Sequence, residues 1–265
     1  MTKVSRIILF LILAIVSLGS TSCLATKSRV HNRSSDPTYE VLLDTIRLFD
    51  QLRSREVPIA IFKPKRYTAN VQHVVIFSHG YGENRPGSYL AYSYLTRFLA
   101  SKGFFVASIQ HELPTDSLIP SSGIPQIVRR PFWDRGADNI LFVINELKKS
   151  NPELDFANVA LIGHSNGGDM VALFPQKYPN VARKIITLDN RRMALPGTSD
   201  PKVYSLRSSD QPADVDVLPT DEKQKRLGMT IIKLSSTKHN DMNDFGNEEQ
   251  HAEINNYVLE FLRDR

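Results

Sequence analysis

Cysteine is almost absent from this chain, because Cys23 is the only one among its 265 residues. A single cysteine cannot form an internal disulfide. A strong excess of one charge is also missing, since 33 basic residues stand against 28 acidic ones. No long basic run alternates with aromatic residues, and the segment Lys63–Arg66 is typical of a solvated loop. We therefore expect no nucleic-acid partner.

A hydrophobic run long enough to remain in a membrane as a helix is missing too. The apolar stretch Ile7–Leu18 is shorter than the roughly 20 residues that cross a bilayer. Lys3 and Arg6 precede this stretch and small residues follow it, which is the pattern of a secretory signal peptide. We expect residues 1–25 to be that signal peptide, and the protein to be exported to the cell envelope or secreted.

Cys23 stands directly after the small residues, where a bacterial lipoprotein carries its acylated cysteine. Ser20 occupies the position three residues earlier, where leucine is usual, so cleavage after Ala25 by an ordinary signal peptidase is the alternative. Residues 26–38 are rich in polar and basic side chains and are expected to form a tether. A lipid anchor at Cys23 is the one membrane contact that the sequence predicts.

Short apolar segments rich in β-branched residues recur beyond the tether and alternate with helical patterns. The expected strands are Val41–Phe49, Val57–Phe62, His73–Phe77, Phe104–Ile109, Val159–Ile162, Lys184–Leu188, Val203–Leu206 and Thr230–Leu234, with helices at Tyr89–Ser101, Asn139–Lys149 and Glu248–Arg263. The first two strands are close enough for an antiparallel hairpin, and the later ones are apolar on both faces. Residues 39–265 are therefore predicted to form one α/β domain, with a mostly parallel sheet of about eight strands and helices on both faces.

A candidate nucleophile lies in the segment Gly163–Gly168 (GHSNGG), which directly follows the apolar run Val159–Ile162. A serine in a sharp strand-to-helix turn crowds its neighbours, so glycines are needed two residues before and two after it. Gly163 and Gly167 occupy those positions. The turn lifts the serine hydroxyl above the sheet and directs the N-terminus of the next helix toward it. We predict that Ser165 is a catalytic nucleophile.

Two other segments supply its expected partners. In the nucleophile–acid–base order of this arrangement the base comes late, and His239 follows the last expected strand. The glycine-containing segment Phe77–Gly82 follows the third strand, so the N–H groups of Tyr81 and Asn166 are the expected oxyanion hole. His79 is expected to be a structural loop residue.

The acid has more than one candidate. Asp210 lies four residues past Leu206 at the end of the penultimate strand, which is the usual place. Asp189 ends the preceding strand, and Asp214 is a third option. Only one carboxylate has to accept the imidazole N–H and hold its tautomer. Position favours Asp210 over the other two.

The motifs that carry a family resemblance are spread over most of the chain from about residue 40: Phe77–Gly82, Gly163–Gly168, Leu188–Asp189, and His239 with Asp244–Phe245. They resemble those of serine hydrolases of the α/β-hydrolase superfamily, most of all platelet-activating-factor acetylhydrolase and its dienelactone-hydrolase-like and polyester-hydrolase-like relatives. The resemblance implies an α/β-hydrolase fold. It would transfer the acid to Asp189 from the acetylhydrolases and to Asp210 from the polyester hydrolases. Dienelactone hydrolases proper use a cysteine nucleophile, whereas this chain has Ser165.

The substrate cleft is expected to be open. Only residues 191–201 connect the strand ending at Leu188 to the next one, which leaves no room for a large lid. The insertion His111–Pro131 is expected to line one wall of the cleft beside Trp133. Arg191 and Arg192 are typical of a solvated turn, although they could bind an anionic group. An open cleft suits short-chain or water-soluble acyl esters.

The sequence thus predicts a serine hydrolase that cleaves small-molecule carboxylic esters through an acyl-enzyme and needs no cofactor. No metal site is expected, because the spacing of His239, Asp241 and Asp244 matches no established ligand pattern. A catalytically silent envelope binding protein of the same fold is one alternative. A secreted serine peptidase is another, since it differs only in the leaving group.

Overall fold

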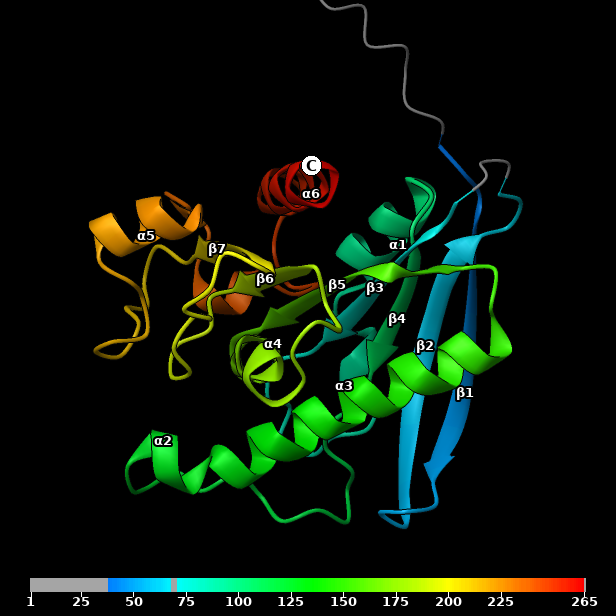
Figure 1. The fold of residues 1–265 in the computed structure, drawn as a ribbon, viewed down its shortest axis with the longest axis horizontal. Helices are drawn as coiled ribbons and strands as arrows, with labels where there is room; N and C mark the ends of the chain where they lie inside the picture. The colour runs from blue at the N-terminus through cyan, green and yellow to red at the C-terminus, as the bar shows by residue number, and fades with distance from the viewer. Residues whose placement is uncertain (1–37, 68–70, 265) are drawn as a thin grey trace, which may run out of the picture. The chain divides into compact units, whose positions relative to one another are not determined.

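The computed structural model describes residues 38–67 and 71–264. In this part of the chain, eight strands form one sheet in the order β1-β2-β4-β3-β5-β6-β7-β8 (Figure 1). The strands are β1 (Val41–Asp50), β2 (Arg55–Pro64), β3 (His73–Ser78), β4 (Phe105–Ile109), β5 (Asp155–His164), β6 (Lys184–Leu188), β7 (Lys202–Arg207) and β8 (Thr230–Lys233). The helices are α1 (Ser93–Ser101), α2 (Pro125–Val128), α3 (Arg130–Ser150), α4 (Ser165–Lys177), α5 (Asp221–Leu227) and α6 (Glu248–Arg263), with short 3₁₀ turns η1 (Ser88–Leu90) and η2 (His239–Asp241).

The sheet is mixed but mostly parallel, as predicted. β1 and β2 pair as the expected antiparallel hairpin, and β2 also runs antiparallel to β4. Every other pairing, from β4 through β3 and β5 to β8, is parallel. The carboxyl ends of β3, β5, β6, β7 and β8 therefore lie along one edge of the sheet, where parallel α/β sheets carry their functional groups.

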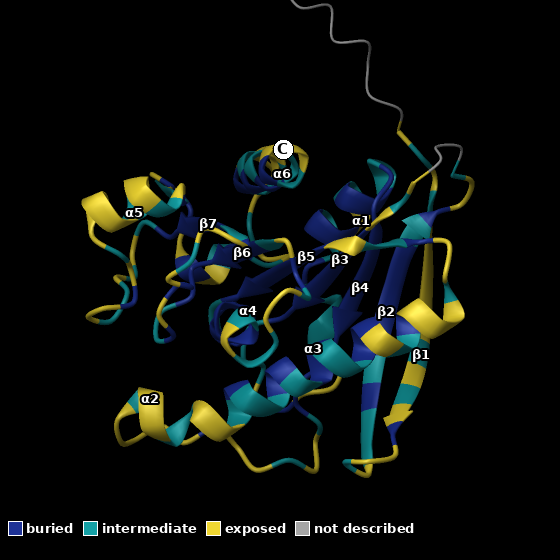
Figure 2. Cartoon of the chain, viewed as in Figure 1, coloured by how far each residue is buried: buried dark blue, intermediate teal, exposed yellow. Residues whose placement is uncertain are grey.

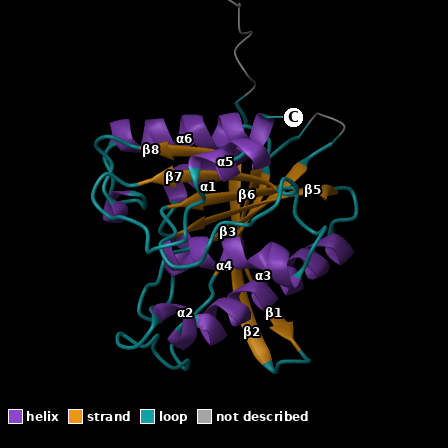
Figure 3. Ribbon diagram, turned by 60° about the vertical axis from the view of Figure 1, so that its left-hand side comes forward, coloured by secondary structure: helices purple, strands orange, loops and turns teal. Residues whose placement is uncertain are grey.

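Helices cover both faces of the sheet because its central strands are apolar on both sides (Figures 1 and 3). On β3, Val74 and Ile76 belong to the cluster formed with α3 and α4, whereas Val75 and Phe77 belong to the cluster formed with α1 and α6. This alternation follows from the two-residue period of a strand. The central strands are buried over most of their length, and exposed residues gather on the outer surfaces of helices such as α5 (Figure 2).

The helix boundaries follow from local end signals. α6 has the predicted bounds, Glu248–Arg263. Its start is fixed by a reciprocal capping box between Asn247 and Gln250. α3 begins at Arg130 rather than at Asn139, because Pro131 occupies the first turn, where a missing N–H leaves no helical hydrogen bond unmade. α2 and α5 were not among the helices predicted from the sequence.

The predicted signal peptide of residues 1–25, with Cys23, lies outside the described residues, as does nearly all of the tether of residues 26–38. The predictions made for them remain predictions. No helix within 38–67 or 71–264 is long and apolar enough to cross a bilayer.

Candidate active site

Ser165 lies in a sharp turn between β5 and α4. Its φ angle is 51°, in the left-handed region that is rarely adopted by residues with a side chain. A Cβ atom on Gly163 would overlap the carbonyl of Gly167, and one on Gly167 would overlap the carbonyl of Ser78. Only glycine fits at both positions, which is what the sequence pattern requires of this turn.

A serine, a histidine and an aspartate lie in line at this turn. The Ser165 hydroxyl donates to His239 Nε2 over 3.0 Å, and His239 Nδ1–H donates to Asp189 Oδ2 over 2.6 Å. His239 lies in η2 after β8, and Asp189 follows β6 directly. Three separate strand ends therefore bring the groups together, and the carboxylate is fully buried.

Asp210, the acid favoured by position, does not contact the imidazole. Its Oδ1 accepts the backbone N–H of His239 over 2.8 Å instead. The geometry thus differs from the expectation, because β7 ends at Arg207 and the following loop carries Asp210 to the main chain of η2. Asp214 accepts a hydrogen bond from Gln126 over 3.4 Å and makes none with His239.

The environment of Asp189 favours its ionised form. Burial raises the pKa of this carboxyl, but the hydrogen bond from His239, the charge of Arg207 and the N–H of Ser208 together hold it below its usual value. The Arg207 guanidinium lies 3.0 Å from Asp189 Oδ1, and the Ser208 N–H donates to the same oxygen over 3.0 Å. Asp189 therefore presents one oxygen to its anchors and the other to His239.

A second chain of hydrogen bonds reaches the backbone carbonyl of His239. Tyr92 accepts the N–H of Gly80 over 2.9 Å and donates to His164 Nδ1 over 2.7 Å. That leaves His164 Nε2–H to donate to the carbonyl of His239 over 3.1 Å. Burial, with a smaller effect of His239, lowers the pKa of His164 to about 3, so His164 acts here as a neutral bridge. The sequence analysis set His164 aside as a base and did not single out Tyr92.

The two expected oxyanion donors lie on adjoining segments, Tyr81 on the loop after β3 and Asn166 in the first turn of α4. Ser78 at the end of β3 pairs with Gly163 in β5, which places the loop containing Tyr81 beside the turn at Ser165. Asn166 is the second residue of α4, and N–H groups in the first turn of a helix have no partner within the helix. Those N–H groups and the helix dipole favour negative charge at this end of α4.

His79 is buried and takes a structural part in the same loop. Its Nδ1–H donates to the carbonyl of Gly80 over 2.6 Å, and its Nε2 accepts the N–H of His111 over 3.1 Å. Burial lowers the pKa of His79 to about 4, which keeps the ring neutral.

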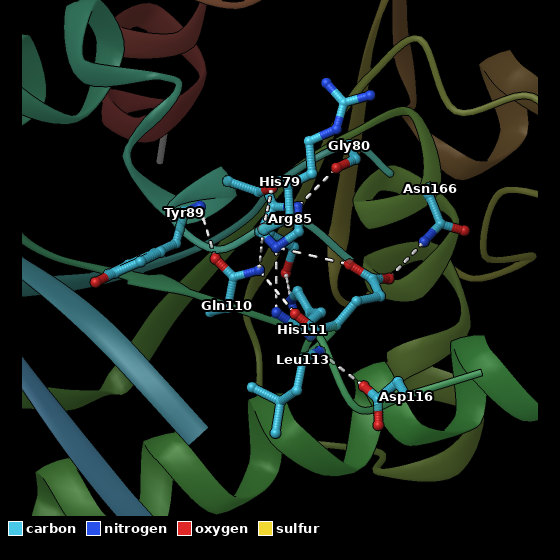
Figure 4. Close-up of polar contacts among 12 residues, drawn as sticks. His79, Gly80, Arg85, Tyr89, Gln110, His111, Leu113, Asp116 and Asn166 are labelled. Carbon is cyan, nitrogen blue, oxygen red and sulfur yellow. Dashed lines mark hydrogen bonds and ion pairs between the residues drawn. The ribbon is translucent and has the colours of Figure 1, made fainter. Parts of the chain in front are cut away.

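The buried carboxyl group of Glu112 lies between the first turn of α4 and the loop after β3. Its neighbours Asn166, His79 and His111 are labelled in Figure 4. Glu112 Oε1 accepts from the side-chain amide of Asn166 over 3.1 Å. Glu112 Oε2 has no hydrogen-bond partner and lies 3.7 Å from His79 Nε2. Burial raises the pKa of Glu112 to about 7, against the lowering effect of the Arg135 charge. No sequence signal marked this residue.

The Glu112 carboxyl should make stability depend on pH. Its pKa rises from the usual 4.5 to about 7 on folding, so the folded state binds the extra proton between those values. The contribution of Glu112 to stability therefore falls as pH rises from about 4.5 to about 7. Glu112→Gln should thus raise the free energy of unfolding, relative to wild type, by up to about 3 kcal/mol more at pH 8 than at pH 5.

Urea titrations at both pH values measure this difference. Glu153→Gln, at an exposed position, is the matched control and should show equal effects at both pH values. An equal effect of Glu112→Gln at pH 5 and pH 8 would contradict the raised pKa.

Trp133, which follows the insertion after β4, does not lie at the surface of a cleft as expected. Trp133 is fully buried instead of lining a cleft wall, and its indole N–H donates to Asn166 Oδ1 over 2.9 Å. The insertion itself reaches the loop after β3, because the N–H of Ile119 donates to the Tyr81 hydroxyl over 3.0 Å. The connection from β6 to β7 contains no helix, as predicted.

The acidic residues near His239 serve other contacts. Asp241 accepts from the backbone N–H of Lys238 and from the Gln250 side chain, while Asp244 caps the start of α1 through the N–H groups of Ser93 and Tyr94. Within the described residues, no group of three or more His, Cys, Asp or Glu side chains is arranged to hold a metal ion.

No protein-family model matches the chain, and no curated protein sequence matches it either. Solved structures do match. The esterase Est22 has a TM-score of 0.61 at 9% identity, over 87% of this chain and 83% of that one. A bacterial heroin esterase has a TM-score of 0.58 at 14% identity, over 84% and 85%. The Francisella virulence factor BioJ has a TM-score of 0.57 at 15% identity, over 86% of both chains.

Because the sequence identities are low, these matches establish the fold alone. The chain has an α/β-hydrolase fold that resembles esterases, with a mixed, mostly parallel eight-stranded sheet. This bears out the predicted fold class. The specific branch suggested by the sequence motifs is not established by these matches.

Proposed function

We propose that this protein hydrolyses carboxylic esters through an acyl-enzyme formed on Ser165. One observation carries the proposal: the Ser165 hydroxyl, the His239 imidazole and the Asp189 carboxylate are joined by hydrogen bonds of 3.0 and 2.6 Å on a fold shared with esterases. A nucleophile, a base and an acid that orients the base are the parts that acyl transfer requires.

In the proposed reaction, Ser165 Oγ bonds to the ester carbonyl carbon while His239 Nε2 takes the hydroxyl proton. The N–H groups of Tyr81 and Asn166 stabilise the negative oxygen. The alcohol then leaves with the proton from His239, and the acyl group stays on Ser165. A water molecule, deprotonated by His239, then attacks the acyl-enzyme and releases the carboxylic acid. One water is consumed for each ester.

Two features support small or water-soluble esters as substrates. The connection between β6 and β7 is short and carries no helical lid, so the edge that holds Ser165 is not closed from that side. The insertion after β4 reaches the Tyr81 loop through the N–H of Ile119, and its exposed side chains Leu118, Ile124 and Ile127 are available to a short acyl chain.

A fluorophosphonate probe tests the nucleophile directly, because it reacts with an activated serine and needs no knowledge of the substrate. We expect stoichiometric labelling of Ser165, located by peptide mass spectrometry. A panel of p-nitrophenyl esters of increasing chain length, with p-nitroanilides of the same acyl groups, should then show ester cleavage that is fastest for short chains. Absence of labelling would favour a silent binding protein, and faster anilide cleavage would favour a peptidase.

A further inference from the structure

Three arginines gather beside the nucleophile helix. Arg129 lies between α2 and α3, while Arg191 and Arg192 follow Asp189 by two and three residues. All three are half-buried. Burial lowers the pKa of the Arg129 guanidinium, and the charges of Arg192 and Arg191 lower it further, against the raising effect of the Asp169 carboxylate. The three guanidinium groups thus share one partly desolvated neighbourhood.

The same neighbourhood includes the candidate active site. Tyr81, on the loop of the expected oxyanion hole, is among the residues that act on the charge of Arg129. The backbone N–H groups of Arg192 and Met193 donate to Asp169 Oδ1 over 3.0 and 2.9 Å. Asp169 lies one turn after Ser165 on α4, and residues four apart share a helix face. The loop of Arg191 and Arg192 is therefore fastened to the nucleophile helix.

Helix α2 also contacts the loop of Arg191 and Arg192. The side chain of Gln126 donates to the carbonyl of Arg192 over 3.3 Å and to Asp214 over 3.4 Å. Arg129 follows α2 directly, so these contacts hold it near the loop. The contacts that hold the cluster together thus run through backbone atoms and the Gln126 side chain, and none of them joins a guanidinium group to a carboxylate.

Charge compensation in the cluster is incomplete, because the buried Asp169 carboxylate is, among the described residues, the one negative charge set against Arg129 and Arg192. Within residues 38–67 and 71–264, none of these three guanidinium groups makes an ion pair with a carboxylate, whereas the neighbouring Arg207 pairs with Asp189. Arg191 donates to neutral acceptors, the side-chain oxygen of Gln211 and the carbonyl of Pro212. Nε of Arg192 is buried without a partner. Like charges held together and partly out of water repel each other, and a bound anion would relieve that repulsion.

We propose that Arg129, Arg191 and Arg192 form an anion subsite beside Ser165, and that the substrate is an ester carrying a carboxylate or phosphate group. This inference rests on the proposed ester hydrolysis. Guanidinium groups bind both anions through paired N–H donors, which gives orientation as well as attraction. The anion would anchor one end of the substrate while the ester carbonyl lies against the Ser165 hydroxyl.

Two esters of matched length test the subsite. The p-nitrophenyl monoester of glutaric acid carries a carboxylate at the far end of its acyl group, and p-nitrophenyl pentanoate is its neutral counterpart. We expect the wild-type protein to prefer the glutarate ester in kcat/KM. Arg192→Gln and Arg129→Gln should each lower that preference roughly 10- to 100-fold, since each removes a charge-assisted hydrogen bond. Arg226→Gln, at an exposed position on α5, is the control and should leave the preference unchanged.

Competition identifies which anion is preferred. Succinate and inorganic phosphate should each inhibit pentanoate hydrolysis competitively, and the stronger of the two indicates whether the natural substrate carries a carboxylate or a phosphate. Equal rates on both esters, with no competition by either anion, would overturn the subsite while leaving ester hydrolysis intact.

Calorimetry separates the subsite from the chemistry. Glutarate titrated into the folded Ser165→Ala protein should bind, and the binding should be lost when Arg192→Gln is added. If the wild-type protein hydrolyses neither ester, the proposed function fails, and this titration still decides whether the arginines bind an anion. Circular dichroism of each variant excludes unfolding as the cause of a loss.

Discussion

Replacing Ser165 with alanine is expected to lower kcat for ester hydrolysis by roughly 10⁴- to 10⁶-fold. The substitution removes the Oγ atom that lies 3.0 Å from His239 Nε2 and leaves the base without a proton to accept. The side chain is small and only partly buried, so the fold should persist. Initial rates on a short-chain p-nitrophenyl ester, at enzyme concentrations high enough to detect the residual rate, measure the loss.

Fluorophosphonate labelling should disappear in the same variant, and an unchanged circular dichroism spectrum controls for folding. Asn240→Ala, next to His239 but exposed, is a suitable second control and should retain both labelling and activity. A Ser165→Ala protein that kept a tenth or more of wild-type activity would contradict the nucleophile assignment.

Replacing Asp189 with asparagine is expected to lower kcat by up to about 10⁴-fold, the loss known when a triad aspartate is exchanged for its amide. An asparagine amide group at this position presents no charge to the imidazole and favours the wrong tautomer of His239. Asp210→Asn should cost far less, because Asp210 contacts only the backbone N–H of His239, over 2.8 Å. Comparing both variants on one ester separates these roles.

The Asp189 variant needs a folding control of its own, because it leaves the buried Arg207 guanidinium without its carboxylate. The double variant Asp189→Asn with Arg207→Gln removes both charges. If the loss of kcat persists in a well-folded double variant, it is due to the missing contact with His239 and not to an uncompensated charge. A larger loss at Asp210 than at Asp189 would contradict the assignment that the geometry supports.

Local signals in the sequence were enough for the sheet and for the nucleophile turn. The parallel strands were predictable because each is a short β-branched run that is apolar on both faces. The turn at Ser165 was predictable because only glycine avoids an overlap with the main chain at positions 163 and 167. The bounds predicted for α6 are those of the structure, and the capping box between Asn247 and Gln250 accounts for its start. In each case the decisive contacts lie within a few residues of one another or within a single pair of strands.

The acid could not be chosen in this way, because Asp189 and Asp210 both follow strands that end at the same edge of the sheet. The paths of two loops decided between them. Asp189 leaves β6 with a φ of 54° and meets the imidazole at once, whereas the longer course after β7 takes Asp210 to the backbone of η2. Which of the two carboxylates meets the imidazole depends on how these loops pack, and residue spacing does not reveal that.

The residues that support the candidate site could not be predicted from the sequence either. Tyr92, His164 and Glu112 come from different parts of the chain, and each is defined by buried partners on other elements. The arginines at 129, 191 and 192 form one cluster only because α2 and the loop after β6 are fastened together. The sequence by itself therefore determined the fold class, the sharp turn at Ser165 and the place of His239 after the last strand, since these depend on short-range stereochemistry and chain order. The tertiary structure alone decided which carboxylate faces His239 and where the uncompensated charge collects, because both depend on long-range packing.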